Sequence, residues 1–497
     1  MIYTNPIVKG FYPDPSVCSA NGKYYLACSS FQFFPGVPLF ESSDLVNWTQ
    51  IGHVLTRKSQ VMLDNVNSSG GVFAPMICFN EGRFYMTTNN NTTQQNFYVY
   101  TDDIYGEWSE PVYVEQDGID PSLFFEDGKA YFMTNGHDDN GVEGIVQCEI
   151  DINTGKKLSK SKAIWHGTGG RYLEGPHMYK INNSYYIMAA EGGTEYGHMI
   201  VYAKGNSVWG EFNNYPENPV LTNRDKAPYT IQGIGHGDLV KDKYGNWHMI
   251  SLGFRQIDIW QPYHHLGREV FLTPVHFDAD GWFSAGDDGT TKESYEIQGN
   301  FTQNIKNLYT FENTEWNKDW CFIRHPHAEN YDFYNNRVIL RGTDITLEDV
   351  ASPTFIGIRQ KDFSGEISCK VKTNGGEAGI SLFMCENEHY DISIITDDKG
   401  TAAALKLNIG DIKHIQNTYA LSDNEINSLT LIIRMNRLDY SFYVKCGDSE
   451  HFLGRAKTKY LSSEVSSGFT GVVIGLYAIG NNEAEFTEFN CEYSDNR

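Results

Sequence analysis

The first half of this 497-residue sequence repeats one short pattern, and the repeat limits the fold more than any other feature. Four copies begin at Pro15, Pro75, Pro121 and Pro176, and in each a turn follows the proline by seven residues, with a tyrosine three residues later. A looser fifth copy spans residues 235–250. Turn residues between two short runs of aromatic and β-branched residues indicate a β-hairpin in every copy.

The spacing of the copies predicts how these hairpins are arranged. Successive anchor residues lie 46 to 61 residues apart, at or somewhat above the length of a four-stranded propeller blade, about 40 to 50 residues. Five copies therefore predict a five-bladed β-propeller. The alternative is a β-sandwich with chance similarities, but a sandwich has no reason to repeat over so long a period.

The position before each anchor carries an acid in three of the five copies. Asp14 and Asp120 stand directly before the proline, and Glu174 stands two residues before it. Residues at one repeat position converge on the propeller channel, so these acids are predicted to meet. Each acid taken alone could be a turn residue that satisfies nearby N–H groups. The second copy has Ala74 at this position, so the turn itself does not require an acid.

Composition narrows the classes of partner. With 39 basic and 63 acidic side chains, the net charge of −24 argues against binding nucleic acid. The content of 31 Tyr, 29 Phe and 9 Trp suits sheet structure and aromatic-lined sugar sites. Nine scattered cysteines without a C-x-x-C pair predict neither a zinc site nor a disulfide framework, and indicate a reducing compartment. No leader pattern or long apolar run is seen, so we expect a cytoplasmic protein without a membrane partner.

The C-terminal part of the chain differs from the repeats. Residues 284–307 are polar and contain glycines, as a linker does, and short alternating runs from Leu308 onward predict about a dozen strands. We therefore expect an all-β chain with two domains, a propeller over residues 1–295 and a β-sandwich over residues 305–497.

Seven motifs in a fixed order carry a resemblance to a known family: Tyr12–Ser16, Phe34–Val37, Ser43–Trp48, Gly71–Pro75, Gly118–Ser122, Glu174–His177 and His265–Glu269. Together they resemble glycoside hydrolase family 43, the inverting β-xylosidases and α-L-arabinofuranosidases built on a five-bladed propeller. The C-terminal part is similar to the concanavalin-like, jelly-roll sandwich appended to the xylosidases of that family. The resemblance implies an exo-glycosidase that releases terminal β-D-xylose or α-L-arabinofuranose from hemicellulose-derived oligosaccharides.

The resemblance also implies roles for the three acids. Inverting hydrolysis needs a carboxylate that activates water and a carboxylic acid that protonates the leaving oxygen, about 6.5–9.5 Å apart. Asp14 matches the base and Glu174 the acid. Asp120 matches a residue that raises the pKa of the acid and orients it. The chemistry requires no cofactor.

Four further residues match binding positions of the family. His236 would face a central ion or water cluster, commonly calcium, bound through water; the alternative is a hydrogen-bonded structural histidine. Arg268 would donate to substrate hydroxyls, or else pair with Glu269 on the surface. Phe33 and Phe73 would pack against the sugar, or else belong to the core of a sheet. Many relatives carry Trp where this chain has Phe73.

Two other functions are consistent with a propeller that bears acids. One is a retaining fructosidase, whose nucleophile lies in Asn-Asp-Pro and whose acid lies in Glu-Cys-Pro, where this chain has Tyr-Pro-Asp-Pro-Ser and Glu-Gly-Pro. The other is a non-catalytic carbohydrate-binding propeller. The expected partner is a small oligosaccharide, and a homo-oligomer is left open. So is the role of the sandwich, which could bind sugar, cap the site, or only stabilise and oligomerise the propeller.

Overall fold

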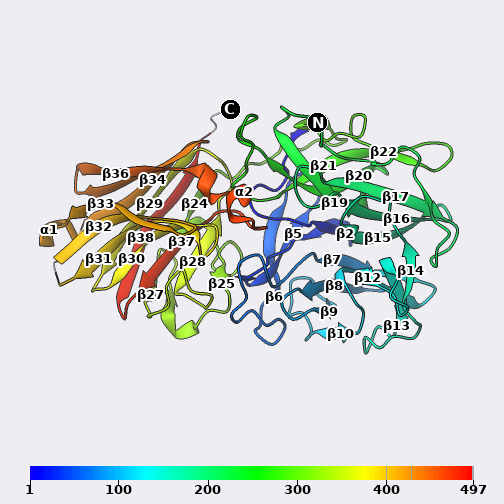
Figure 1. Cartoon of the computed structure of the whole chain (residues 1–497), viewed down its shortest axis with the longest axis horizontal. Helices are drawn as coiled ribbons and strands as arrows, with labels where there is room; N and C mark the ends of the chain where they lie inside the picture. The colour runs from blue at the N-terminus through cyan, green and yellow to red at the C-terminus, as the bar shows by residue number, and fades with distance from the viewer. Residues whose placement is uncertain (399, 427, 495–497) are drawn as a thin grey trace.

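The chain forms two β-rich bodies that lie side by side (Figure 1). A computed structural model describes residues 1–398, 400–426 and 428–494. The N-terminal body, coloured blue to green, is followed by the C-terminal body in yellow to red. The predicted all-β chain with a propeller followed by a sandwich is confirmed. Within the described ranges, no helix has the length and apolar character needed to cross a membrane.

Residues 1–300, all of which are described, contain five four-stranded antiparallel sheets, each built from one continuous stretch of chain. In chain order their strands are β2 (Ser16–Ala20), β3 (Lys23–Ala27), β5 (Gly36–Ser42) and β6 (Thr49–Leu55); β7 (Met76–Asn80), β8 (Arg83–Asn90), β9 (Gln95–Thr101) and β10 (Val112–Val114); β11 (Ile119–Glu126), β12 (Lys129–His137), β13 (Glu143–Ile150) and β14 (Lys162–Trp165); β15 (Glu174–Ile181), β16 (Ser184–Glu191), β17 (Met199–Gly205) and β18 (Asn213–Asn214); β19 (Ile231–Lys241), β20 (Trp247–Arg255), β21 (Glu269–Phe277) and β22 (Phe283–Ala285).

The first strands of the five sheets form a ring. Strand β2 contacts β7, β7 contacts β11, β11 contacts β15, and β15 contacts β19, which returns to β2. The ends of this region are joined by pairing of β1 (Ile2–Thr4) with β23 (Ser294–Glu296). The ring brings the starts of the first strands, where the predicted acids lie, to one end of the channel.

The hairpin turns explain why the repeat folds in this way. In each of the first four sheets, both residues of the first turn have positive φ, as in Asn21–Gly22 (52° and 78°) and Asn182–Asn183 (49° and 67°). Positive φ at both central residues is the pattern of a type I′ turn, whose twist matches that of the two flanking strands. Asn and Gly adopt this backbone with little strain, so the local sequence fixes the register of each hairpin.

The C-terminal body is a sandwich of two antiparallel sheets in the part of the chain that is described. One sheet contains β24 (Leu308–Thr310), β26 (Tyr331–Phe333), β27 (Arg337–Arg341), β29 (Gly365–Thr373), β34 (Leu429–Met435), β35 (Asp439–Cys446), β36 (Ser449–Lys457) and β38 (Glu483–Tyr493). The other contains β28 (Phe355–Arg359), β30 (Glu377–Phe383), β31 (Glu388–Asp397), β32 (Gly400–Ile409), β33 (Ile412–Ala420) and β37 (Val473–Ile479). The short helices are η1 (Phe311–Asn313), η2 (Ala328–Asn330), η3 (Thr458–Leu461), α1 (Asp423–Ile426) and α2 (Ser463–Ser466).

Alternation along the strands places the sandwich core between its two sheets. In β29, Ile367, Cys369 and Val371 are buried, while the residues between them are more exposed. In the facing sheet, Ile392 and Ile394 of β31 belong to the same buried cluster. This period of two residues is what an antiparallel sheet with one buried face requires.

A short sheet and an apolar cluster join the two bodies. Strand β25 (Phe322–Ile323) of the C-terminal body pairs with β4 (Phe33–Phe34) of the propeller. Phe33 is 0 % exposed and shares a cluster with Phe11 of the propeller and with Phe355 of the sandwich. Of the two interpretations of Phe33, contact with sugar or packing in a core, the structure supports core packing. Its ring lies 5.9 Å from that of Phe11 in an edge-on arrangement.

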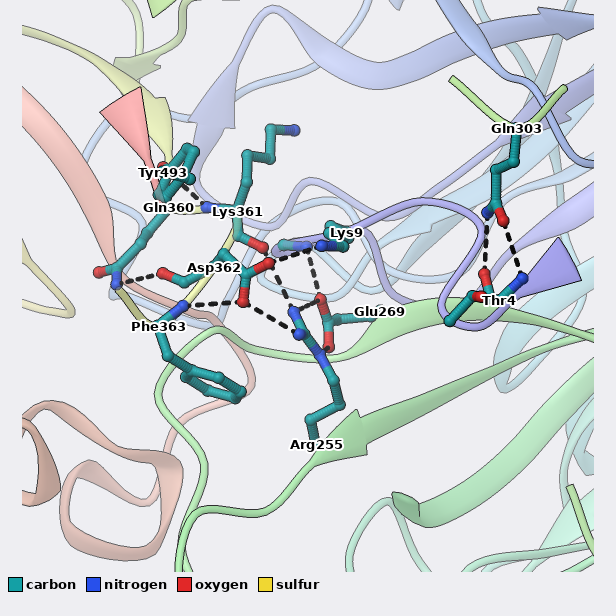
Figure 2. Close-up of polar contacts among 11 residues, drawn as sticks. Thr4, Lys9, Arg255, Glu269, Gln303, Gln360, Lys361, Asp362, Phe363 and Tyr493 are labelled. Atoms are coloured by element: carbon teal, nitrogen blue, oxygen red, sulfur yellow. Dashed lines mark hydrogen bonds and ion pairs between the residues drawn. The ribbon is translucent and has the colours of Figure 1, made fainter. Parts of the chain in front are cut away.

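An ionic network at the same junction reaches the segment that precedes Asp14 (Figure 2). Arg255 donates to both carboxylate oxygens of Glu269, at 2.7 and 2.9 Å, and to Asp362 of the sandwich at 3.1 Å. Lys9 also pairs with Asp362. Glu269, which is 0 % exposed, accepts a hydrogen bond from the backbone N–H of Gly10 at 2.9 Å. The sandwich is thus tied to the propeller only a few residues before the candidate base.

Candidate active site

The backbone at the start of the innermost strands has an unusual conformation. Asp14, Asp120 and His236 have φ of 53°, 52° and 40°, values that residues other than glycine seldom adopt. In the third, fourth and fifth sheets, the pairing register shifts at this point, as in a β-bulge, and bulges redirect side chains next to active sites. In the fourth sheet Gly175 takes the left-handed position, with φ of 61°. Gly175 occupies the position that Asp14 and Asp120 hold in the first and third sheets, directly before the proline. Because glycine has no side chain, the acid of the fourth sheet comes from the preceding residue, Glu174.

Asp14 is buried, at 6 % exposure, and is surrounded by donors. Its Oδ1 accepts from Arg268 Nη1 at 2.8 Å, and its Oδ2 accepts from the hydroxyl of Ser29. His236 Nδ1 lies 3.7 Å from the same Oδ1. Burial raises the pKa of this carboxyl, but Arg268, then His236 and the Ser29 hydrogen bond outweigh it, and the net shift is downward. Asp14 is therefore ionised at neutral pH.

The pKa values of Glu174 and Asp120 shift in the opposite direction, upward. Burial, followed by the negative charge of Asp14, raises the pKa of Glu174 to about 7 against a smaller opposing effect of Arg268. Burial, Glu174 and Asp14 likewise raise the pKa of Asp120. Asp120 Oδ2 accepts from the backbone N–H of Gly175 at 3.1 Å, so it holds the residue that follows Glu174. These two carboxyls together retain a proton near neutral pH.

Arg268 links the acids to the sandwich. It is 5 % exposed, and its Nη1 also donates to Thr194 Oγ1 at 2.9 Å. Its guanidinium carbon lies 5.7 Å from the ring centroid of Phe31 and 5.7 Å from that of Phe469, which belongs to the sandwich. The alternative of a surface pair with Glu269 is wrong, because Arg268 is buried and Glu269 accepts from another arginine.

Three aromatic rings, those of Phe31, Phe73 and Phe469, form what we call the aromatic rim. The ring of Phe73 lies 5.3 Å from that of Phe31 and 6.3 Å from that of Phe469, edge-on to both. Phe469 remains 38 % exposed, and its backbone N–H donates to Ser69 Oγ at 2.8 Å. Of the two phenylalanines predicted to contact sugar, Phe33 is fully buried in the junction cluster, whereas Phe73 is only partly buried and packs against that cluster from outside.

The sequence reasoning missed Ser29, Thr194, Phe31 and Phe469. None of them occupies the repeat position that identified the acids. Ser29 and Phe31 follow the first hairpin, Thr194 lies between β16 and β17, and Phe469 reaches the site from the other domain. The one available signal was for Phe31, because residues 31–34 contain three phenylalanines and a single glutamine.

Within the described residues, the structure gathers no set of direct metal ligands around His236. Burial lowers the pKa of His236 to about 4, so the imidazole is neutral, and it packs so close to Gly175 that a Cβ there would lie 2.7 Å from the ring. Farther along the channel, the carboxylate of Asp238 already accepts from Tyr179 at 2.6 Å and Ser16 at 2.8 Å. No group of three or more His, Cys, Asp or Glu that could hold a metal occurs in the described ranges. Calcium prefers many oxygen ligands, and an ion held through water stays a prediction.

Known proteins resemble this chain over both bodies. A family model described as glycosyl hydrolases family 43 matches residues 3–283, and one described as the beta xylosidase C-terminal concanavalin A-like domain matches residues 309–492. A non-reducing end alpha-L-arabinofuranosidase of Bacteroides ovatus is 36 % identical, covering 100 % of this chain and 94 % of its own length. A xylosidase/arabinosidase of Butyrivibrio fibrisolvens is 35 % identical, covering 99 % and 98 %. A solved structure from the Bacteroides ovatus xyloglucan PUL superimposes with a TM-score of 0.91 at 36 % identity, over 99 % of this chain and 100 % of that one.

Proposed function

Because the chain belongs to glycosyl hydrolases family 43, we propose that it is an exo-acting glycosidase that removes terminal β-D-xylosyl or α-L-arabinofuranosyl residues with inversion of configuration. The substrates are short oligosaccharides derived from hemicellulose. One observation carries the proposal: Asp14 is buried against Arg268, 2.8 Å away, and Ser29, which lower its pKa, whereas burial near the charge of Asp14 raises the pKa of Glu174 to about 7. Two carboxyls whose environments drive their pKa values apart are what base and acid roles require.

In the proposed reaction, a water molecule attacks the anomeric carbon from the side opposite the leaving sugar. Asp14 accepts a proton from this water as the new C–O bond forms. The bond from the anomeric carbon to the leaving oxygen breaks, and Glu174 gives its proton to that oxygen. The cycle ends with Asp14 protonated and Glu174 ionised, and exchange with solvent restores the starting state.

The remaining residues have supporting roles in this proposal. Asp120 orients the acid through its hydrogen bond to the backbone next to Glu174. Arg268 keeps the base ionised and presents its remaining N–H groups to sugar hydroxyls, for which a planar fork of donors is suited. Phe73 of the aromatic rim packs against the sugar ring, and His236 faces the channel as a neutral imidazole.

A panel of aryl β-D-xylosides and α-L-arabinofuranosides tests the activity, and NMR of the first-formed sugar anomer tests the stereochemistry. We expect hydrolysis of at least one glycoside with inversion, abolition by Asp14→Asn, and unchanged rates for Asp102→Asn, whose carboxylate is exposed on the second sheet. Retention would overturn the single displacement and favour the fructosidase type of mechanism. Sugar binding without hydrolysis would instead favour the non-catalytic propeller.

We also propose that the protein functions in a reducing, cytoplasmic compartment. All nine cysteines fall in the described ranges, and all are free. Most are buried in the two cores, where the thiol behaves as a small apolar group. Fractionation of cells that express the native gene, with immunodetection in each fraction, tests this location; recovery outside the cytoplasm would contradict it.

A further inference from the structure

The loop that leads into Glu174, residues 166–173 between β14 and β15, is held in a defined conformation. The carboxylate of Glu191, which is 0 % exposed, accepts from the backbone N–H of Thr168 at 2.6 Å and from that of Gly170 at 3.1 Å. Because both oxygens of this buried carboxylate accept hydrogen bonds from the loop backbone, Glu191 fixes the loop on the fourth sheet. The loop therefore presents its exposed residues in one orientation.

Tyr172 is the prominent exposed residue of this loop. Its side chain is 61 % exposed, although its backbone has a φ of 55°. For a bulky residue this left-handed conformation is strained, and such strain is found mainly where the surrounding structure and a function maintain it. The neighbouring Arg171 secures the backbone, since its carbonyl accepts from Gly192 N–H at 2.8 Å and its Nε donates to Gly192 O at 2.9 Å.

The ring of Tyr172 lies next to a segment that contacts the candidate site. A Cβ placed on Gly193 would be 3.1 Å from Tyr172 Cδ2, so one edge of the ring lies on this glycine. The next residue, Thr194, accepts from Arg268 Nη1, the nitrogen that also binds the candidate base. Tyr172 is two residues before Glu174, which limits the separation of their Cα atoms to about 7 Å. The backbone that carries the ring is thus close to the candidate acid.

We propose that Tyr172 is a binding platform for the sugar of the leaving group. The inference rests on the proposed function, because the acid protonates the oxygen of the leaving group and the segment that carries both the acid and Tyr172 then borders the leaving side. Arg171 covers one side of the ring, with its guanidinium carbon 5.4 Å from the centroid, and this leaves apolar ring surface for the C–H face of a sugar. The phenolic hydroxyl remains in water or donates to a sugar hydroxyl.

Substrates that differ only in the leaving group test this role. One is the disaccharide of the glycone found with the aryl panel, and the other is the glycosyl fluoride of the same glycone, whose leaving group has no ring. Tyr172→Gly removes the ring and suits the left-handed backbone, whereas Tyr172→Phe retains the stacking surface. Tyr244→Gly is the matched control, because Tyr244 is 47 % exposed and follows β19 at the far end of its strand.

We expect Tyr172→Gly to lower kcat/KM for the disaccharide about tenfold or more and to change the fluoride rate much less. Tyr172→Phe should retain most of the disaccharide rate, and Tyr244→Gly should change neither. An equal loss on both substrates, or no loss on either, would overturn the platform role. Circular dichroism and Tm identify a variant that has unfolded, and Tyr172→Asn, which also lacks the ring and tolerates the left-handed backbone, then decides through its ratio of the two rates. If the wild type hydrolyses neither these substrates nor the aryl glycosides, the proposed function fails and the inference fails with it.

Discussion

Replacing Arg268 with methionine tests the electrostatic origin of the acid and base roles. In the wild type, kcat/KM should rise with pH as Asp14 loses its proton and fall again as Glu174 loses its proton, near pH 7. The arginine lowers the pKa of both carboxyls. Its removal should therefore move both limbs of the profile to higher pH, while the maximum rate falls because a substrate contact is lost.

The structure indicates the size of the shift. Arg268 Nη1 lies 2.8 Å from Asp14 Oδ1, and both side chains are buried. Unit charges about 4 Å apart at an effective dielectric constant of about 20 interact by about 4 kcal/mol, which corresponds to about 3 pKa units. Ser29 and His236 remain as partners, and water can enter the vacated space, so we expect the acidic limb to move by about 1–3 units. The alkaline limb should move less, since Arg268 is the smallest of the effects on Glu174.

The assay is kcat/KM for an aryl glycoside measured from acidic to alkaline pH. Arg268→Lys is the informative companion, because it retains the charge but loses the planar fork; its limbs should stay close to those of the wild type while KM rises. Arg455→Met, at an exposed arginine of the sandwich, controls for a general loss of positive charge. A fall in rate for Arg268→Met without any movement of the limbs would refute the reasoning and leave the arginine as a substrate ligand only.

Three further changes test other parts of the molecule. Glu174→Ala should reduce kcat/KM for a disaccharide by about 10² or more but affect good aryl leaving groups much less, and the alkaline limb near pH 7 should disappear; an equal loss for all leaving groups would contradict the acid role. Phe469→Ala should raise KM about tenfold with little change in Tm, since the ring is 38 % exposed; an unchanged KM would exclude contact with substrate. Arg255→Met leaves the buried carboxylate of Glu269 without its bidentate partner and should lower the free energy of unfolding by about 3–5 kcal/mol in a denaturant titration, compared with about 0.5 or less for Arg455→Met.

The features that sequence reasoning predicted are those determined by local chemistry. Turn pairs such as Asn21–Gly22 carry their own backbone preference, so the hairpins and their repeat could be read directly from the chain. The repeat then located Asp14, Asp120 and Glu174, because equivalent positions of a ring of strands must converge. Even the offset of Glu174 has a local cause in the left-handed conformation of Gly175.

The features that it could not predict depend on packing between distant segments. Phe33 and Phe73 look alike in the sequence, but only the pairing of β4 with β25 of the sandwich buries Phe33 completely. Phe469 lies in a loop with no relation to the repeat, and nothing in its neighbourhood indicates that it would reach Arg268. Burial and partner choice in such cases are set by the arrangement of the two bodies, which periodicity does not encode.

The contacts of Arg268 also bear on the role that the sequence left open for the sandwich. The guanidinium carbon lies 5.7 Å from the ring centroids of both Phe31 of the propeller and Phe469 of the sandwich, whose rings stack on each other 5.9 Å apart, and its Nη2 donates to the carbonyl of Phe469 at 3.4 Å. The same guanidinium lowers the pKa of Asp14. We infer that a displacement of the loop that carries Phe469 would alter both the aromatic rim and the protonation of the candidate base. The sandwich therefore does more than stabilise the propeller: it supplies one side of the environment on which the proposed chemistry depends.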